Sequence, residues 1–225
     1  TAIAAEAGLF LQIPVDAEGY DGEAYSGLYV YTGNQAEGLP APAVGDVITV
    51  TGTYDDFFGQ LQVSRITGLT VDGQADVPPP ILVAPADVAT GGARAGELEG
   101  VRVRIEDVGV TAINPPAGPG DGDPTNAFVV DGGLRINDLF YAVDPLPMVG
   151  ARFAFIQGML RFANGDSKLE PTGMADLSTG PAEVAGLGPA GAITRAGVAD
   201  AVPTTPGGEA LIVRLTGPAE EGGQP

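Results

Sequence analysis

The chain has 225 residues, 35 of them glycine and 20 proline, and its formal charge is -19 because 29 acidic residues outnumber 10 basic ones. Cysteine and histidine are absent, which excludes disulfides, Ser–His or Cys–His nucleophile pairs and His-ligated zinc or iron. The only lysine is Lys168, and the arginines are scattered, so the charge opposes binding to nucleic acid and anionic membranes. We expect a protein that is not an enzyme, does not bind nucleic acid and does not insert into membranes.

The abundance of glycine and proline is typical of short strands joined by tight turns. We therefore predict an all-β protein with almost no helix, apart from one helical turn within residues 86–96. The acidity suits solubility outside the cell. Together with a first residue other than methionine, it leads us to expect an extracellular or cell-surface protein made with a signal peptide or as a longer precursor.

Residues 1–72 are expected to form a first small barrel. Its five short strands are expected at residues 1–3, 9–13, 28–31, 47–54 and 60–69. Gly52 interrupts the fourth strand, and because glycine has no Cβ we predict a bulge or a barrel corner there. Three consecutive prolines then stiffen a spacer that covers residues 73–97.

Residues 98–177 are expected to form a second barrel with the same order of elements. Val101, Val103 and Ile105 alternate with polar residues, as in a strand with one buried face. Further strands are expected at residues 128–131, 134–137, 152–162 and 168–171. Gly158 takes the place of Gly52, and Asn164-Gly165-Asp166 predicts a hairpin turn.

Two observations concern the ends of the chain. Thr1-Ala2-Ile3 repeats Thr111-Ala112-Ile113, which suggests that the first copy begins in the middle of a strand. The tail, residues 178–225, is rich in glycine, alanine and proline, except for one expected strand at 209–217. That strand carries Leu211, Val213 and Leu215 on one face and has no partner that the sequence identifies.

The phrases VGDVITVTGTYDDFFGQLQV and VGARFAFIQGMLRFANGDSKLEP, compared side by side, resemble tandem OB-fold domains of secreted bacterial proteins. Such domains precede the catalytic domain of large extracellular nucleases. GLFLQ and GLYVYTG in the first copy, and LEGVRVRIEDVGVT and FVV in the second, carry the resemblance over most of the first 175 residues. It implies two tandem five-stranded OB-like barrels without catalytic residues, and the tail resembles the start of a bacterial Ig-like domain.

In OB-folds, aromatic side chains on strands two and three commonly contact the ligand. The matching aromatic residues are Phe10, Tyr29, Tyr31, Phe128, Phe140 and Tyr141. Without basic residues among them, contact with a glycan or a peptide is a better expectation than contact with nucleic acid. Ordinary packing remains the alternative.

Calcium is the cofactor that the acidic loops could hold, because it prefers six to eight oxygen ligands on a flexible loop. The candidate ligands are Asp16, Glu18, Asp21, Glu23, Asp121 and Asp123. Their spacing does not follow the EF-hand pattern. Solvated acidic loops without a metal are the alternative, and no other cofactor is expected.

Two functions remain open. The first is a structural or adhesive subunit that self-associates into a ring or filament, with strand 209–217 of one copy completing the first barrel of the next. The second is a ligand-binding accessory module of a secreted nuclease or other degradative enzyme. A fragment whose first strand and Ig-like domain belong to a longer chain would account for the same unpaired segments.

Overall fold

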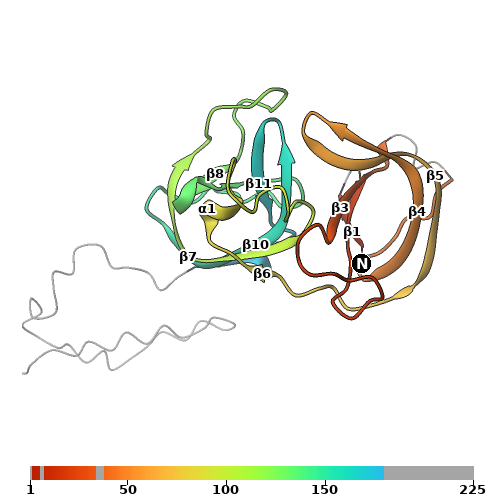
Figure 1. Cartoon of the computed structure of the whole chain (residues 1–225). Coiled ribbons are helices and arrows are strands. Elements are labelled where there is room, and N and C mark those ends of the chain that lie inside the picture. Colours follow the sequence, from red (N-terminus) through yellow and green to blue (C-terminus); the bar gives the residue numbers. More distant parts are fainter. Residues whose placement is uncertain (1, 6–7, 34–37, 180–225) are drawn as a thin grey trace, which may run out of the picture. The chain divides into compact units, whose positions relative to one another are not determined.

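The computed structural model describes residues 2–5, 8–33 and 38–179, which belong to one compact unit (Figure 1). These residues form an all-β fold, as predicted. The only α-helix among them is the single turn α1 (Pro85–Val88), which overlaps the stretch expected to contain one. No helix in this part of the chain is long and apolar enough to cross a membrane. Strand 209–217 and the rest of the tail lie outside the described residues.

Five strands in the second half close into a barrel. They are β7 (Arg102–Ile113), β8 (Phe128–Val130), β9 (Arg135–Ile136), β10 (Arg152–Ala163) and β11 (Asp166–Glu170). They pair in the order β7-β8-β9-β11-β10, and β10 pairs back with β7. Only the β9–β11 pair of this ring is parallel. This order is compatible with an OB-like barrel.

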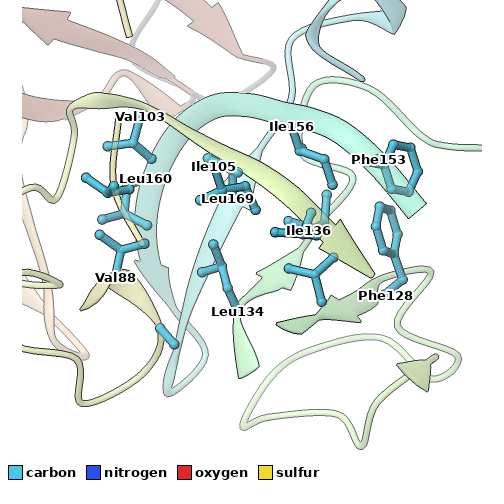
Figure 2. Close-up of a cluster of buried hydrophobic side chains, with 14 of the residues drawn as sticks. Val88, Val103, Ile105, Phe128, Leu134, Ile136, Phe153, Ile156, Leu160 and Leu169 are labelled. Atoms are coloured by element: carbon cyan, nitrogen blue, oxygen red, sulfur yellow. The ribbon is translucent and has the colours of Figure 1, made fainter. Parts of the chain in front are cut away.

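The long strand β7 closes the barrel because its two halves have different partners. Residues 102–109 pair with β10, and residues 110–113 pair with β8, with a register shift between Val110 and Ala112. Val103 and Ile105 are fully buried, as their alternation predicts, and Figure 2 shows them among the core side chains of the neighbouring strands. Within the half that pairs with β10, Asp107 has a φ of 50° and no partner in the register, which runs from Val108 opposite Phe153 to Glu106 opposite Phe155.

Shorter elements extend the barrel. β6 (Ile81–Leu82) adds a parallel pair to β7, and β12 (Leu177–Thr179) pairs with β10. The 3-10 turn η2 (Asp131–Gly133) lies between β8 and β9, and η3 (Met174–Asp176) lies between β11 and β12. One half of β10 therefore has a strand on each edge, β7 and β12.

The first half forms a five-stranded sheet, which we call the N-terminal sheet. Its strands are β1 (Ala2–Ala5), β2 (Gly8–Gln12), β3 (Gly27–Tyr31), β4 (Asp46–Phe57) and β5 (Gln60–Gln74). They pair in the order β1-β2-β3-β5-β4, the same order as in the barrel, but β4 does not pair back with β1. The expectation of two closed barrels is therefore not met. The four residues of β1 pair with β2, and no described segment takes the place that residues 102–109 have beside β10.

The long strands β4 and β10 each bend at the glycine predicted for them, Gly52 and Gly158. A Cβ on Gly52 would lie 2.6 Å from the Ser64 carbonyl oxygen, and one on Gly158 would lie 2.3 Å from the Glu170 carbonyl oxygen. The β4–β5 register shifts between Thr51 and Thr53, on either side of Gly52. Only glycine lets two backbones approach so closely at the corner.

Matching two-residue turns follow the two long strands. Asn164 and Gly165, with φ values of 58° and 85°, join β10 to β11, as the sequence predicts. Phe58 and Gly59, with φ values of 53° and 88°, join β4 to β5. Positive φ suits asparagine and glycine, whereas it is unfavourable for a phenylalanine.

Phe58→Asn is therefore expected to raise the free energy of unfolding by about 1 kcal/mol, because the left-handed conformation costs a bulky L-residue on that scale. The Phe58 side chain is 83% exposed, so little apolar burial is lost. Urea denaturation measures the change. Phe57→Asn is the control, since the backbone of Phe57 does not have a positive φ. An equal gain from both variants would show that the backbone conformation of Phe58 is not its cause.

Candidate functional site

The predicted calcium ligands are distributed over separate places. Glu23 forms an ion pair with Arg94 at 3.1 Å, and Asp121 forms one with Lys168 at 2.7 Å. Asp16, Glu18 and Asp21 lie in the loop between β2 and β3, and Asp123 lies in the loop between β7 and β8. Within the described ranges, no three acidic side chains are grouped so that they could hold a metal ion. Calcium binding stays a prediction.

The six predicted ligand-face aromatic residues do not share one open surface. Phe10 and Tyr29 are buried with their rings 4.9 Å apart, and Phe140 packs on Phe10 at 5.8 Å. Met159 of the barrel belongs to the same cluster, so these rings join the N-terminal sheet to the barrel. Phe128 is also buried and stacks on Phe153 in the barrel core.

Tyr31 is the most accessible member of the predicted set. Tyr31 is 44% exposed, and Tyr141 is half-buried. Other aromatic residues are more exposed, among them Tyr25, Tyr54, Phe57 and Phe58. They were not among the predicted site residues because they lie outside the second and third strands of the first copy, at 9–13 and 28–31.

The clearest unusual feature is the free edge of β4. Residues 46–51 pair with β5 on one side, as β10 pairs with β12, but nothing in the described part of the chain pairs with the other side. Val50 and Tyr54 occupy the places of Ile156 and Leu160, as their pairing shows. Tyr54 is 62% exposed, whereas Leu160 is 1% exposed, so the missing neighbour leaves an apolar surface uncovered.

A hollow of about 450 Å³ lies against this strand. Its lining includes Leu11, Leu28, Ile48, Tyr54, Leu61 and Glu99. In the closed barrel, buried residues of β7 fill the corresponding space and pack on β10. The hollow therefore has the place and the apolar character that a first barrel strand would require.

Glu99 is the one carboxyl group in the lining of this hollow. Burial raises the pKa of its carboxyl from 4.5 to about 7, although the backbone N–H of Leu61 donates a hydrogen bond to it at 3.3 Å. The negative charge of Asp56 acts in the same direction as burial, and the positive charge of Arg161 opposes it. A carboxyl group with such a pKa changes its charge near neutral pH.

The raised pKa predicts a pH effect on stability. Between about pH 4.5 and pH 7 the folded state retains a proton that the unfolded state releases, so this carboxyl makes the fold less stable as pH rises through that window. Glu99→Gln should therefore gain stability relative to the parent as pH rises from 4.5 to 7, with a constant difference above 7. Urea midpoints at pH 4.5, 6 and 8 measure this. A difference independent of pH, or one shared by Glu18→Gln on an exposed loop, would contradict it.

No family model, curated protein or solved structure matches the chain. A function for this chain is therefore inferred from its own residues and their geometry.

Proposed function

We propose that the chain is a non-enzymatic structural subunit that self-associates by strand complementation. In this proposal a strand from a neighbouring copy pairs with the free edge of β4 and extends the line of β1. It takes the place that residues 102–109 have beside β10 in the barrel, and it covers the hollow beside Ile48 and Tyr54. The free edge of β4 is the observation that carries the proposal. An unpaired edge beside an apolar hollow favours added strands, because backbone groups gain partners and apolar surface leaves water.

Residues 209–217 are the proposed donor. Their sequence, EALIVRLTG, places Leu211, Val213 and Leu215 on one face of an extended strand, and they lie outside the described residues. Burying three such side chains contributes on the order of 5 kcal/mol before the cost of ordering the segment. The donor and the acceptor edge are different surfaces, so the contact is heterologous and produces a ring or a filament.

An extracellular or cell-surface location completes the proposal. The acidic, cysteine-free composition is compatible with a soluble extracellular subunit, and the net charge of -19 limits nonspecific association. Assembly through paired backbone groups needs neither disulfides nor a cofactor.

Assembly state tests the proposal directly. The parent protein should form long or closed assemblies in negative-stain images and by light scattering, and deletion of residues 207–225 should leave monomers. Val213→Asp should abolish assembly because it introduces a charge on the apolar face. Ala210→Asp adds the same charge on the opposite face and should preserve assembly.

A direct binding measurement separates strand complementation from association through a different surface. A fluorescently labelled peptide of residues 207–219 should bind the deletion variant, and the peptide carrying Val213→Asp should not. The proposal is wrong if the deletion variant forms assemblies as long as those of the parent. It is also wrong if the parent is monomeric and the peptide does not bind. That result is expected if the chain is a fragment and a segment of the longer chain covers β4.

A ligand-binding accessory module is the second candidate function. A separate hollow between the β4–β5 hairpin and the barrel favours it, because aromatic and polar side chains meet there. Such a module would remain monomeric and would retain ligand binding after deletion of residues 207–225.

A further inference from the structure

The hairpin between β4 and β5 carries an aromatic pair in an unusual position. Phe57 is 57% exposed and Phe58 is 83% exposed, and their rings meet edge to face at 4.8 Å. Phe58 has a φ of 53°, a conformation that Asn164 adopts in the matching turn of the barrel. The strained backbone gains no compensation from burial, and such strain is frequent at ligand sites.

A hollow of about 580 Å³ lies beside these rings. Its lining includes Phe57, Phe58, Gln60, Pro119, Arg161 and Ala163, and none of the lining residues is acidic. The hollow combines residues from β4, β5 and the barrel, so it depends on the contact between the N-terminal sheet and the barrel. Most of the surface is apolar, and Arg161 supplies the one formal charge in the lining.

Two side chains that line this hollow each have one buried hydrogen-bond donor without an acceptor in the described part of the chain. Gln60 is 4% exposed, and its Oε1 accepts a hydrogen bond from Arg161 Nη2 at 3.4 Å, which orients its Nε2 as a free donor. Gln60 Nε2 and Arg161 Nε are buried without a partner among the described residues. Buried polar atoms are usually hydrogen-bonded, so these two donors indicate an acceptor that belongs here.

Arg161 forms no ion pair among the residues that the structure describes. Its guanidinium lies 5.6 Å from the centre of the Tyr29 ring. Burial raises the pKa of the two nearby carboxyl groups, Glu99 and Glu170, and this effect is larger than the opposing effect of the positive charge of Arg161, so their charged forms are disfavoured. A guanidinium in these surroundings favours an anionic acceptor.

We propose that this hollow binds a single carboxylate attached to an apolar, ring-sized body. The carboxylate accepts hydrogen bonds from Arg161 and Gln60 after a small adjustment of these side chains, and the body packs on Phe57 and Phe58. A peptide C-terminus with an apolar last residue and a free aromatic acid both have this chemistry. Polyanions are disfavoured because the net charge of the chain is -19. The site is independent of strand complementation.

Two pairs of probes test the chemistry on the full chain by calorimetry and NMR. N-acetylphenylalanine represents the peptide terminus and phenylacetate the free acid, and each is compared with its primary amide. Since a hydrogen bond to a charged group contributes more than a neutral one, we expect each amide to bind about tenfold more weakly than its acid. The stronger of the two acids identifies the source. Equal binding of acids and amides, or no binding at about 10 mM, a concentration at which a millimolar Kd would be seen, overturns the proposal.

Variants locate the site. Phe58→Asn should weaken binding at least about fivefold while keeping the fold, because asparagine occupies the matching barrel turn. Tyr25→Asn is the matched control, since Tyr25 is 74% exposed, has a φ of 58° and lies outside this hollow, and it should leave binding unchanged. Arg161→Gln should remove the preference for the acid. Binding that survives Phe58→Asn, or falls equally in Tyr25→Asn, contradicts the assignment whether or not Arg161→Gln folds.

Discussion

Asp121→Asn is expected to lower the free energy of unfolding by about 3 to 5 kcal/mol, because it leaves a buried ammonium group without its counter-ion. Lys168 Nζ donates to Asp121 Oδ1 at 2.7 Å, and the two side chains are 4% and 13% exposed. The second contact of Lys168, to Asn164 Oδ1 at 3.5 Å, is neutral and cannot replace the lost charge. Urea denaturation monitored by far-UV circular dichroism measures the change.

A double-mutant cycle distinguishes this role of Asp121 from calcium binding. Combining Asp121→Asn with Lys168→Met should recover most of the lost stability, because no unpaired charge then remains. Asp107→Asn is an exposed control: Asp107 pairs with Arg152 at the surface and should cost less than about 1 kcal/mol. If calcium stabilises the parent and EDTA reverses this, and the cycle shows no coupling, Asp121 is a metal ligand and not the counter-ion of Lys168.

Gly158→Ala is expected to destabilise the barrel by about 3 kcal/mol. The new Cβ would lie 2.3 Å from the Glu170 carbonyl oxygen and 2.8 Å from Pro171 N, both of which are backbone atoms. They cannot move aside without opening the β10–β11 corner, where β10 also pairs with β7. Thermal and urea denaturation measure the loss.

Two other glycines serve as comparisons. Gly173→Ala should change stability by less than about 0.5 kcal/mol, since nothing lies within 4 Å of its Cβ position and its φ of 175° is open to any residue. Gly52→Ala should cost less than Gly158→Ala, because β4 has a free edge and can shift. Equal losses of stability in Gly52→Ala and Gly158→Ala would show that closure of the barrel does not determine how much the added Cβ destabilises the fold.

Several features of this protein follow from local sequence. The alternation at Val103 and Ile105 predicts a half-buried strand, and Asn164-Gly165 predicts a tight turn, because side-chain period and backbone preference act over a few residues. Gly52 and Gly158 mark the bends of their strands for the same local reason. The scarcity of helix follows from the glycine and proline content.

Long-range pairing decided what the sequence alone could not. Whether β4 pairs with a first strand depends on contact between segments that are distant in the sequence. A closed barrel and the observed open sheet therefore have the same local sequence pattern, and the sequence alone did not distinguish them. Phe10 and Tyr29 became packing residues because Met159 of the barrel covers them. The Lys168–Asp121 pair spans 47 positions and the Gln60–Arg161 contact spans 101, and no periodicity in the sequence connects residues so far apart. Only the tertiary structure placed the half-buried Arg161 beside an exposed aromatic hairpin, since burial and pairing depend on the whole set of neighbours.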